Sequence, residues 1–253
     1  ITLVPKTEID PATGITALSE FPLKAPYSLF TESIRAISTF IRLHMEMHAG
    51  DRLFNFTSAS SNEGKSTTVA SLARQMASEG LKVLLIDGDT RQPVLTRQFG
   101  LESKSGLTNL LAQECTLNDA LHRDAISGLH IIGAGTHRDT NILSRGKPVW
   151  EEAKKKFLEY YDVILLDSAP LLSISDTKLL ASSAQNIICV RWKHTQVKQI
   201  HFMLDMLKRL NCNLLGTIIT VVDIKKSSVY NKLDNKYYLA PEDQPTGEPQ
   251  TAS

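Results

Sequence analysis

Short, largely apolar runs alternate along the chain with segments in which apolar residues recur every three or four positions. The runs occupy residues 53–56, 83–86, 129–132, 163–166, 187–190 and 214–222. Runs that are apolar on both sides are typical of buried parallel strands, which need a covering layer on each face. The alternation therefore predicts an α/β fold with a mostly parallel sheet and helices on both faces.

The segments between these runs predict the covering helices. The clearest are residues 28–48, 69–77, 148–159 and 195–210. In the first of them one face carries Phe30, Ile34, Ile37, Ile41 and Met45, and in the last one face carries Val197, Ile200, Leu204 and Leu207. These two stripes are expected to face the sheet, since a stripe at this spacing lies on one side of a helix.

Both ends of the chain differ in composition from the middle. Residues 1–26 contain four prolines and predict a linker or lead-in, because proline interrupts helices. Residues 27–222 carry the strand and helix pattern and form the predicted folded domain. Residues 223–253 are rich in proline and polar residues, so a flexible tail is expected there, containing Tyr230, Tyr237 and Tyr238.

Composition narrows the function classes. The net charge of +1 argues against a general affinity for nucleic acid or for an anionic membrane. The three cysteines, Cys115, Cys189 and Cys212, lie far apart in the sequence and show no metal-binding spacing, which suits a reducing compartment. No apolar run approaches the ~20 residues of a membrane span. The chain begins with Ile1 rather than Met, so a membrane anchor could precede it or belong to a partner.

A loop of small residues follows the first apolar run and ends in Gly64, Lys65 and Ser66. Strand, small-residue loop and helix in this order predict a cradle for nucleotide phosphates, in which main-chain N–H groups and the helix N-terminus face the anion. The expected nucleotide-binding residues of the loop are Ser61, Asn62, Glu63, Gly64, Lys65, Ser66 and Thr67. Ala59 stands where the general pattern has glycine, and alanine takes a positive φ only at a cost.

Two further apolar runs end in carboxylates. Asp87 and Asp89 follow the run 83–86, and Asp167 follows 163–166, with Pro170 three residues on. Ligands of open α/β sheets lie beyond the carboxyl ends of the strands, where such carboxylates can hold Mg²⁺. Each carboxylate alone would fit an ordinary turn at a strand end, but three strand ends with suitable groups favour one nucleotide site.

Together these motifs resemble those of the bacterial tyrosine kinases, the autokinases of capsule and exopolysaccharide synthesis. That family belongs to the deviant-Walker ATPases, which have a P-loop NTPase-like fold and include the Min and Par proteins. The resemblance thus implies that residues 27–222 form a P-loop kinase domain. Residues 84–91 are similar to the family's A′ motif, and residues 164–170 to its Walker B motif. The family accepts alanine at the position of Ala59. Ser60 stands where Min and Par proteins carry a signature lysine, which argues against that branch.

The resemblance implies transfer of the γ-phosphoryl group of ATP to tyrosine, with Mg²⁺ as cofactor. It gives catalytic roles to Lys65, Asp87 and Asp89. The implied metal ligands are Ser66, Asp87 and Asp167, with Arg91 and Arg191 near the nucleotide. The implied phosphorylation sites are Tyr230, Tyr237 and Tyr238.

The resemblance also implies partners. Glu32 and Arg35 match the family's oligomerisation motif, whose final arginine is replaced by Ser38, so a homo-oligomer is expected with its assembly in question. A transmembrane polysaccharide co-polymerase region, in the same or a separate chain, and a tyrosine phosphatase are the other expected partners. The implied location is the cytoplasmic side of the bacterial inner membrane.

Two other functions remain compatible with the sequence. The same cradle would serve an ATPase switch that does not phosphorylate tyrosine. It would equally serve a regulator of polysaccharide chain length that binds nucleotide only to control assembly. The short tyrosine cluster and Ser38 are compatible with the second alternative.

Overall fold

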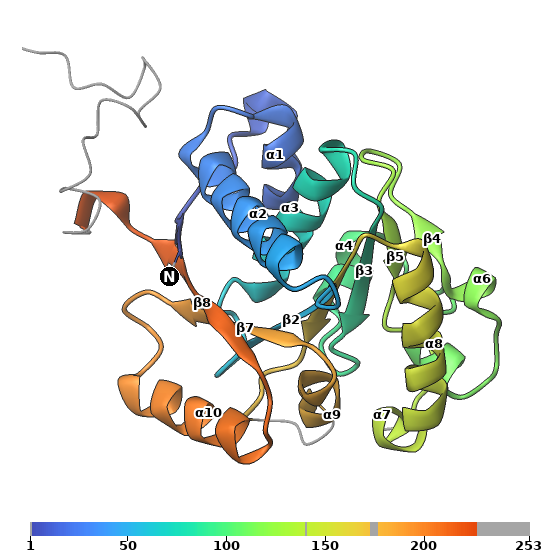
Figure 1. The fold of residues 1–253 in the computed structure, drawn as a ribbon. Helices are drawn as coiled ribbons and strands as arrows, with labels where there is room; N and C mark the ends of the chain where they lie inside the picture. Colours follow the sequence, from blue (N-terminus) through green and yellow to red (C-terminus); the bar gives the residue numbers. More distant parts are fainter. Residues whose placement is uncertain (1, 140, 173–176, 227–253) are drawn as a thin grey trace, which may run out of the picture.

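The computed structural model describes residues 2–139, 141–172 and 177–226. Its centre is an eight-stranded sheet in the order β1-β8-β7-β2-β6-β3-β5-β4 (Figure 1). All neighbouring strands pair in parallel except β4 with β5. The strands are β1 (Thr2–Pro5), β2 (Leu53–Ser58), β3 (Val83–Gly88), β4 (His122–Arg123), β5 (His130–Ile132), β6 (Val163–Ser168), β7 (Gln185–Arg191) and β8 (Leu214–Val222). The predicted α/β fold with a mostly parallel sheet is confirmed.

Helices connect the strands and cover both faces of the sheet (Figure 1). The α-helices are α1 (Phe21–Lys24), α2 (Leu29–Met47), α3 (Lys65–Ser78), α4 (Val94–Gln98), α5 (Leu107–Leu111), α6 (Leu117–Ala120), α7 (Ile142–Arg145), α8 (Lys147–Tyr160), α9 (Thr177–Ser182) and α10 (Val197–Arg209). Short 3₁₀ turns lie at η1 (Pro11–Thr13), η2 (Leu18–Glu20) and η3 (Ile224–Lys226). The four longest predicted helices correspond to α2, α3, α8 and α10.

Alternate residues of each central strand enter different cores. In β3, Val83 and Leu85 pack with α2 and α3, whereas Leu84 and Ile86 pack with the helices of the opposite face. Strand β6 divides its four apolar residues in the same way. This alternation follows from the two-residue period of a strand, and it explains why the runs are apolar at every position.

The first 26 residues differ from the predicted linker. Strand β1 pairs in parallel with β8 and extends the sheet at its edge. Val4 and Phe21 are buried in the core shared with α2 and α3. The prolines occupy places that tolerate them, since Pro5 ends a strand and Pro22 lies in the first turn of α1.

A buried arginine, held by an ion pair within the domain, also donates a hydrogen bond to this N-terminal segment. Nε and Nη2 of Arg74, on α3, each donate to an Asp124 carboxylate oxygen at 3.0 Å, and Nη1 donates to Ser19 Oγ at 2.8 Å. The guanidinium also lies 4.8 Å from the ring centroid of Phe99. The segment is therefore a structural part of the domain. The predicted tail with Tyr230, Tyr237 and Tyr238 lies outside the described residues.

Two helix stripes were predicted, and one of them needs correction. On α2, Phe30, Ile34, Ile37 and Ile41 are buried as expected. On α10, Val197 is 67% exposed, and Met203 and Leu207 are the buried residues. Helix α10 packs against the core through Met203 and Leu207, and its first residue, Val197, lies largely in solvent.

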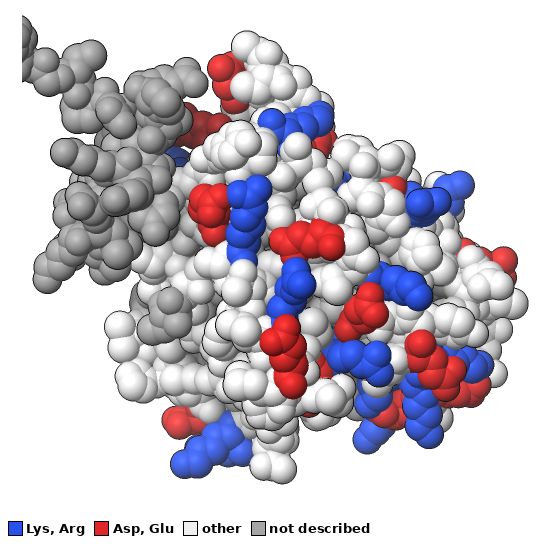
Figure 2. Space-filling view, turned by 45° about the horizontal axis from the view of Figure 1, so that its top comes forward, with Lys and Arg blue, Asp and Glu red and all other residues white. Residues whose placement is uncertain are grey.

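The surface mixes charges of both signs. Figure 2 shows Lys and Arg side chains beside Asp and Glu side chains across one face, in keeping with the small net charge. Within the described ranges, no helix has the length and apolar character that a membrane crossing requires.

Candidate nucleotide-binding site

Three neighbouring strands end together at one edge of the sheet and carry the predicted site. Strand β6 lies between β2 and β3, and residues Asp87 of β3 and Asp167 of β6 are direct register partners. Asp167 is also the register partner of Phe56 in β2, just before the phosphate loop. The parallel register thus brings together three motifs that are far apart in the sequence.

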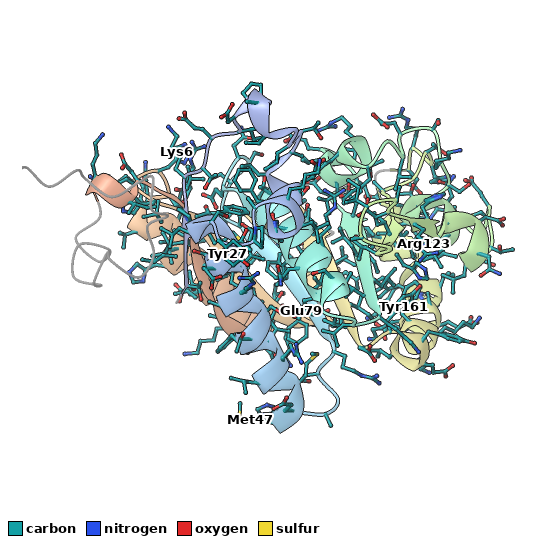
Figure 3. All side chains as sticks on the ribbon, turned by 90° about the horizontal axis from the view of Figure 1, so that it is seen from above. Lys6, Tyr27, Met47, Glu79, Arg123 and Tyr161 are labelled. Atoms are coloured by element: carbon teal, nitrogen blue, oxygen red, sulfur yellow. The ribbon has the colours of Figure 1, made fainter. Side chains whose placement is uncertain are left out.

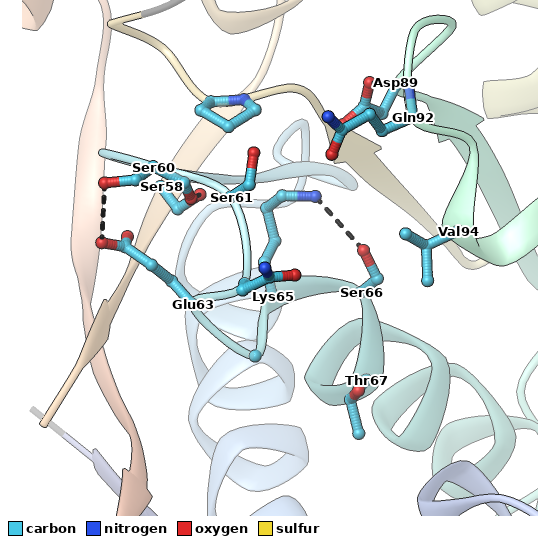
Figure 4. Close-up of a pocket in the computed structure, with 13 residues that line it drawn as sticks. Ser58, Ser60, Ser61, Glu63, Lys65, Ser66, Thr67, Asp89, Gln92 and Val94 are labelled. Carbon is cyan, nitrogen blue, oxygen red and sulfur yellow. Dashed lines mark hydrogen bonds between the residues drawn. The ribbon is translucent and has the colours of Figure 1, made fainter. Parts of the chain in front are cut away.

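The phosphate loop has the conformation that the sequence pattern requires. Strand β2 ends at Ser58 and α3 begins at Lys65. Between them Asn62 and Gly64 have positive φ values of 62° and 73°. Ala59 does not have a positive φ, so the missing glycine at its position costs no backbone strain. The loop encloses a hollow lined by Ser58, Ser60, Ser61, Asn62, Glu63, Gly64, Lys65, Ser66, Thr67, Asp89, Gln92, Val94 and Pro170 (Figure 4).

Hydrogen bonds to Glu63 stabilise the phosphate loop. Its buried carboxylate accepts hydrogen bonds from the main-chain N of Ala59 at 3.0 Å and from Thr195 Oγ1 at 2.7 Å. Its carbonyl oxygen accepts from Thr220 Oγ1 at 2.5 Å. The carboxylate is therefore committed to the loop itself, and the predicted contact of Glu63 with a nucleotide would be made by its main-chain N–H.

Gly64 offers a direct test of the loop. A Cβ at this position would meet Cβ and Oγ1 of Thr220 at 3.1 Å, and φ is +73°. We expect Gly64→Ala to destabilise the protein by about 1–3 kcal/mol and to weaken ATP binding. Thermal unfolding and a nucleotide titration measure both effects. Gly50→Ala is the matched control, since a Cβ at Gly50 meets nothing within 4 Å, and a loss of equal size there would contradict the expectation.

Lys65 and Asp167 form a buried ion pair at the base of the hollow. Lys65 Nζ also lies 3.4 Å from Ser66 Oγ (Figure 4). Burial alone would lower the pKa of Lys65, but the surrounding carboxylates, above all Asp167, raise it above its usual range. The lysine therefore stays an ammonium ion next to the predicted phosphate position.

The second oxygen of Asp167, Oδ2, is buried and has no hydrogen-bond partner. Removing such an oxygen from water without a partner is costly. A hard cation or one of its water ligands would satisfy it, and oxygen ligands are those that Mg²⁺ prefers. Asp167 and Ser66 thus fit the predicted magnesium site.

Asp87 is a buried carboxylate with a strongly shifted pKa. Its Oδ2 accepts hydrogen bonds from the N and Oγ1 of Thr96, at 2.8 and 2.7 Å, and Oδ1 accepts from the N of Asp89 at 3.2 Å. Burial and the charge of Asp167 raise the pKa of Asp87 to about 7, against the lowering effect of the Thr96 hydrogen bonds. A base with a pKa near neutrality is suited to accept a proton and release it again.

The remaining predicted residues lie at different distances from the hollow. Asp89 and Gln92 line it on the side opposite the loop (Figure 4). Arg191 approaches the loop from β7, and its Nη1 donates to the carbonyl of Asn62 at 2.9 Å. Arg91 is exposed and does not line the hollow. The interpretation of Arg91 and Arg191 as nucleotide contacts stays a prediction.

Three threonines position the site through hydrogen bonds that the sequence did not show. Thr96 holds Asp87, Thr195 holds the Glu63 carboxylate and Thr220 holds the Glu63 carbonyl. Thr195 and Thr220 lie more than a hundred residues after the loop, and nothing in the local pattern pointed to Thr220. Thr96 lies in α4, nine residues after Asp87, and this closeness in the sequence is the available signal for its role.

Curated relatives share most of this chain. The EpsB protein of Ralstonia nicotianae, named a putative tyrosine-protein kinase, is 31% identical over 195 residues, which are 76% of this chain and 26% of EpsB. The tyrosine-protein kinase YwqD of Bacillus subtilis is 29% identical over 83% of this chain and 89% of its own. The succinoglycan biosynthesis transport protein ExoP of Rhizobium meliloti is 27% identical over 91% of this chain and 31% of its own. The chain thus spans about a quarter of EpsB but most of YwqD.

Solved structures share the fold. The kinase domain of the Escherichia coli tyrosine kinase ETK superposes with a TM-score of 0.80 at 22% identity, covering 90% of this chain and 91% of that one. Cobyrinic acid a,c-diamide synthase of Mycobacterium smegmatis, with an ATP analogue and magnesium bound, gives 0.58 at 20% identity, over 72% and 79% of the two chains.

The sequence profile of the AAA domain matches residues 61–220, from the phosphate loop to the end of the sheet. This region contains all three nucleotide-site motifs except the first residues of the loop. The chain therefore belongs to the AAA domain family, and within it to the bacterial tyrosine kinase catalytic domains of P-loop fold.

Proposed function

We propose that this protein is an ATP-dependent protein-tyrosine autokinase that regulates exopolysaccharide or capsule polymerisation and export. The observation that carries the proposal is the convergence of Lys65, Asp87 and Asp167 beside one phosphate loop. The names of the putative tyrosine-protein kinase EpsB, the tyrosine-protein kinase YwqD and the succinoglycan biosynthesis transport protein ExoP support the same activity and setting.

The loop residues 61–67 would bind the phosphates of ATP. Ser66 and Asp167 would hold Mg²⁺, and Asp87, the neighbour of Asp167 in the sheet, would be the third proposed metal ligand. Bound Mg²⁺ would neutralise charge on the phosphate oxygens. The ammonium group of Lys65, paired with Asp167 without nucleotide, would turn towards the transferred phosphoryl group. This arrangement stabilises the negative charge of the transition state.

The acceptor hydroxyl needs a base. A tyrosine phenol has a pKa near ~10 and is mostly protonated at neutral pH. Asp87, with its pKa raised to about 7, would accept the phenol proton as the phosphoryl group is transferred. Thr96 fixes the orientation of Asp87, and Asp89, which lines the hollow, would help to position the acceptor.

The proposed acceptors are Tyr230, Tyr237 and Tyr238. If the chain after Lys226 were extended, Tyr238 could lie up to roughly 40 Å from it, which we expect to be enough to enter the site of a neighbouring subunit. Glu32 and Arg35 form an ion pair across one turn of α2, both partly exposed, and we include them in the proposed subunit interface. A transmembrane co-polymerase region and a tyrosine phosphatase are the other proposed partners, at the cytoplasmic side of the inner membrane.

Ser38 has a different role from the arginine that the oligomerisation motif has at its position. It is buried, and its Oγ donates to Glu79 Oε2 on α3 at 3.0 Å, where Arg42 also contacts the same oxygen at 3.3 Å. The third position of the motif thus stabilises the α2–α3 pair within one subunit. In the proposed oligomer, Glu32 and Arg35 are therefore the motif residues that remain to contact a neighbouring subunit.

Mass spectrometry after incubation with Mg-ATP tests the proposal. We expect phosphate on at least one tail tyrosine, and we expect Tyr230→Phe/Tyr237→Phe/Tyr238→Phe to lose most of the incorporated phosphate. The triple variant should still bind ATP as the unchanged protein does, because the described site contains none of these residues. ATP hydrolysis without any phosphotyrosine would instead identify the ATPase switch.

A further inference from the structure

A large hollow lies at the other end of the sheet from the phosphate loop. It has a volume of about 790 Å³ and is bounded by the C-terminal ends of α3 and α8, the start of β3, helix α6 and the turn before β5. Ligand pockets in proteins commonly measure about 300–1,000 Å³. The proposed kinase chemistry leaves this hollow without a role.

Apolar side chains form its floor. Val83, Leu129, Phe157 and the ring of Tyr161 are buried at its base. Leu81, Leu117 and Leu121 complete the apolar wall and are only partly buried. A surface of this kind favours an apolar group of a ligand over water.

The polar lining is basic. The hollow is lined by Lys82, Arg123, His130 and Lys156, and none of the residues that line it is an aspartate or glutamate. Lys156 is paired with Glu152 on the exposed side of α8. Among the described residues, the side chains of Lys82 and Arg123 have no carboxylate within ion-pair distance. This concentration of positive charge contrasts with the nearly neutral chain as a whole.

Arg123 and His130 lie close to each other across the β4–β5 pair, where they are register partners. The Arg123 guanidinium lies against Gly128, and His130 Nδ1 is hydrogen-bonded to the Tyr161 hydroxyl at 2.8 Å. Burial and the charge of Arg123 lower the pKa of His130, so the imidazole is neutral at physiological pH and the fixed charges come from Arg123 and Lys82. Figure 3 shows Arg123 and Tyr161 on the same side of the molecule, far from Met47 at the end of α2.

We propose that this hollow is a second binding site, for a small amphipathic anion with an apolar or aromatic body and one acidic group. The body would lie on the floor formed by Leu129 and Phe157. The acidic group, a phosphate, sulfonate or carboxylate, would accept hydrogen bonds from Arg123 and Lys82. Helix α3 begins at the phosphate loop and ends at this hollow, and strand β3 begins at the hollow and ends near the phosphate loop. The two sites therefore lie at opposite ends of the same two elements.

The dye 8-anilinonaphthalene-1-sulfonate is a suitable probe, because it has an aromatic body and one sulfonate. Fluorescence titration of the full chain at low salt should show one site per chain. We expect Arg123→Gln and Lys82→Gln each to weaken binding about tenfold, the usual effect of losing a hydrogen bond to a charged group. Lys155→Gln, a change of an exposed lysine that does not line the hollow, should leave binding unchanged.

A neutral analogue, N-phenyl-1-naphthylamine, separates this site from a merely apolar patch. We expect it to bind much more weakly, and to respond to neither Arg123→Gln nor Lys82→Gln. Equal affinity of the two dyes, or equal sulfonate binding by Arg123→Gln and Lys155→Gln, would overturn the proposal. Unchanged ATP affinity and cooperative unfolding of each variant show that the fold is intact, and the result does not depend on the kinase assignment.

Discussion

Lys65→Met is expected to abolish phosphorylation of the tail tyrosines by Mg-ATP. Removing a charge that stabilises the transferred phosphoryl group should lower the rate by at least about 100-fold. The measurement is incorporation of label from γ-labelled ATP, with Lys155→Met as a control of equal charge change on the surface of α8. Undiminished labelling by Lys65→Met would contradict the assignment of the site.

The same substitution has a separate structural cost, which must be distinguished from its effect on catalysis. Lys65 and Asp167 are both buried, so Lys65→Met leaves a carboxylate without its counter-charge, at a cost of about 3–5 kcal/mol. The double variant Lys65→Met/Asp167→Asn removes both charges and should recover most of the lost stability. It should remain inactive, because the ammonium group is still missing. If it stayed as unstable as Lys65→Met, the described ion pair would not be the cause.

Asp87→Asn is expected to be inactive and yet more stable than the unchanged nucleotide-free protein. Asparagine cannot accept the phenol proton, and loss of a general base typically lowers a rate by about 10²–10⁴-fold. The amide oxygen can still accept both Thr96 hydrogen bonds, although the longer bond from the N of Asp89 is lost. The change also removes the repulsion between Asp87 and Asp167, which we expect to outweigh that loss. If Asp87→Asn is stable but inactive, Asp87 lowers the stability of the protein and is needed for its activity. A carboxylate with a structural role would instead lower the stability when replaced.

The stability gain should depend on pH in a defined direction. The folded protein keeps the Asp87 proton up to about pH 7, whereas the unfolded chain releases it near the ordinary value of 3.8. The folded state therefore binds more protons in this window, and the stability of the unchanged protein falls as the pH rises through it. Relative to the unchanged protein, the advantage of Asp87→Asn should grow by about 3 kcal/mol between about pH 5 and about pH 8.5.

Thermal unfolding at the two pH values measures this difference, which corresponds to several degrees in Tm. Asp162→Asn serves as a control, because its carboxylate accepts from the exposed main-chain N of Lys82, far from Asp167 in the sheet. A constant difference between Asp87→Asn and the unchanged protein at all pH values would show that Asp87 is already ionised at low pH. The role of Asp87 as a base with a raised pKa would then fail.

Most of the fold could be predicted from local pattern. The apolar runs at 83–86 and 163–166 are buried at every position, because each strand is covered on both faces. The N-terminal segment was the main error. Its prolines indicated a linker, but β1 gains its partner, β8, more than two hundred residues later in the chain, and no local pattern contains that information.

The candidate site also combines features that the sequence predicts with features that it does not. The positive φ values needed by the loop are provided by Gly64 and by Asn62, one of the few other residue types that tolerate them. The sequence could not show that the Glu63 side chain faces inward. That orientation depends on Thr195, which reaches the loop only after β7 has paired with β2.

Residue types at short, fixed spacings were enough to predict the central strands, the long helices, the phosphate loop and the three carboxylates. Contacts formed on folding produced the pairing of Lys65 with Asp167, the raised pKa of Asp87 and the basic hollow around Arg123. Each of these arises from distant segments that parallel strands bring side by side, and burial between them sets the charges that the groups can carry.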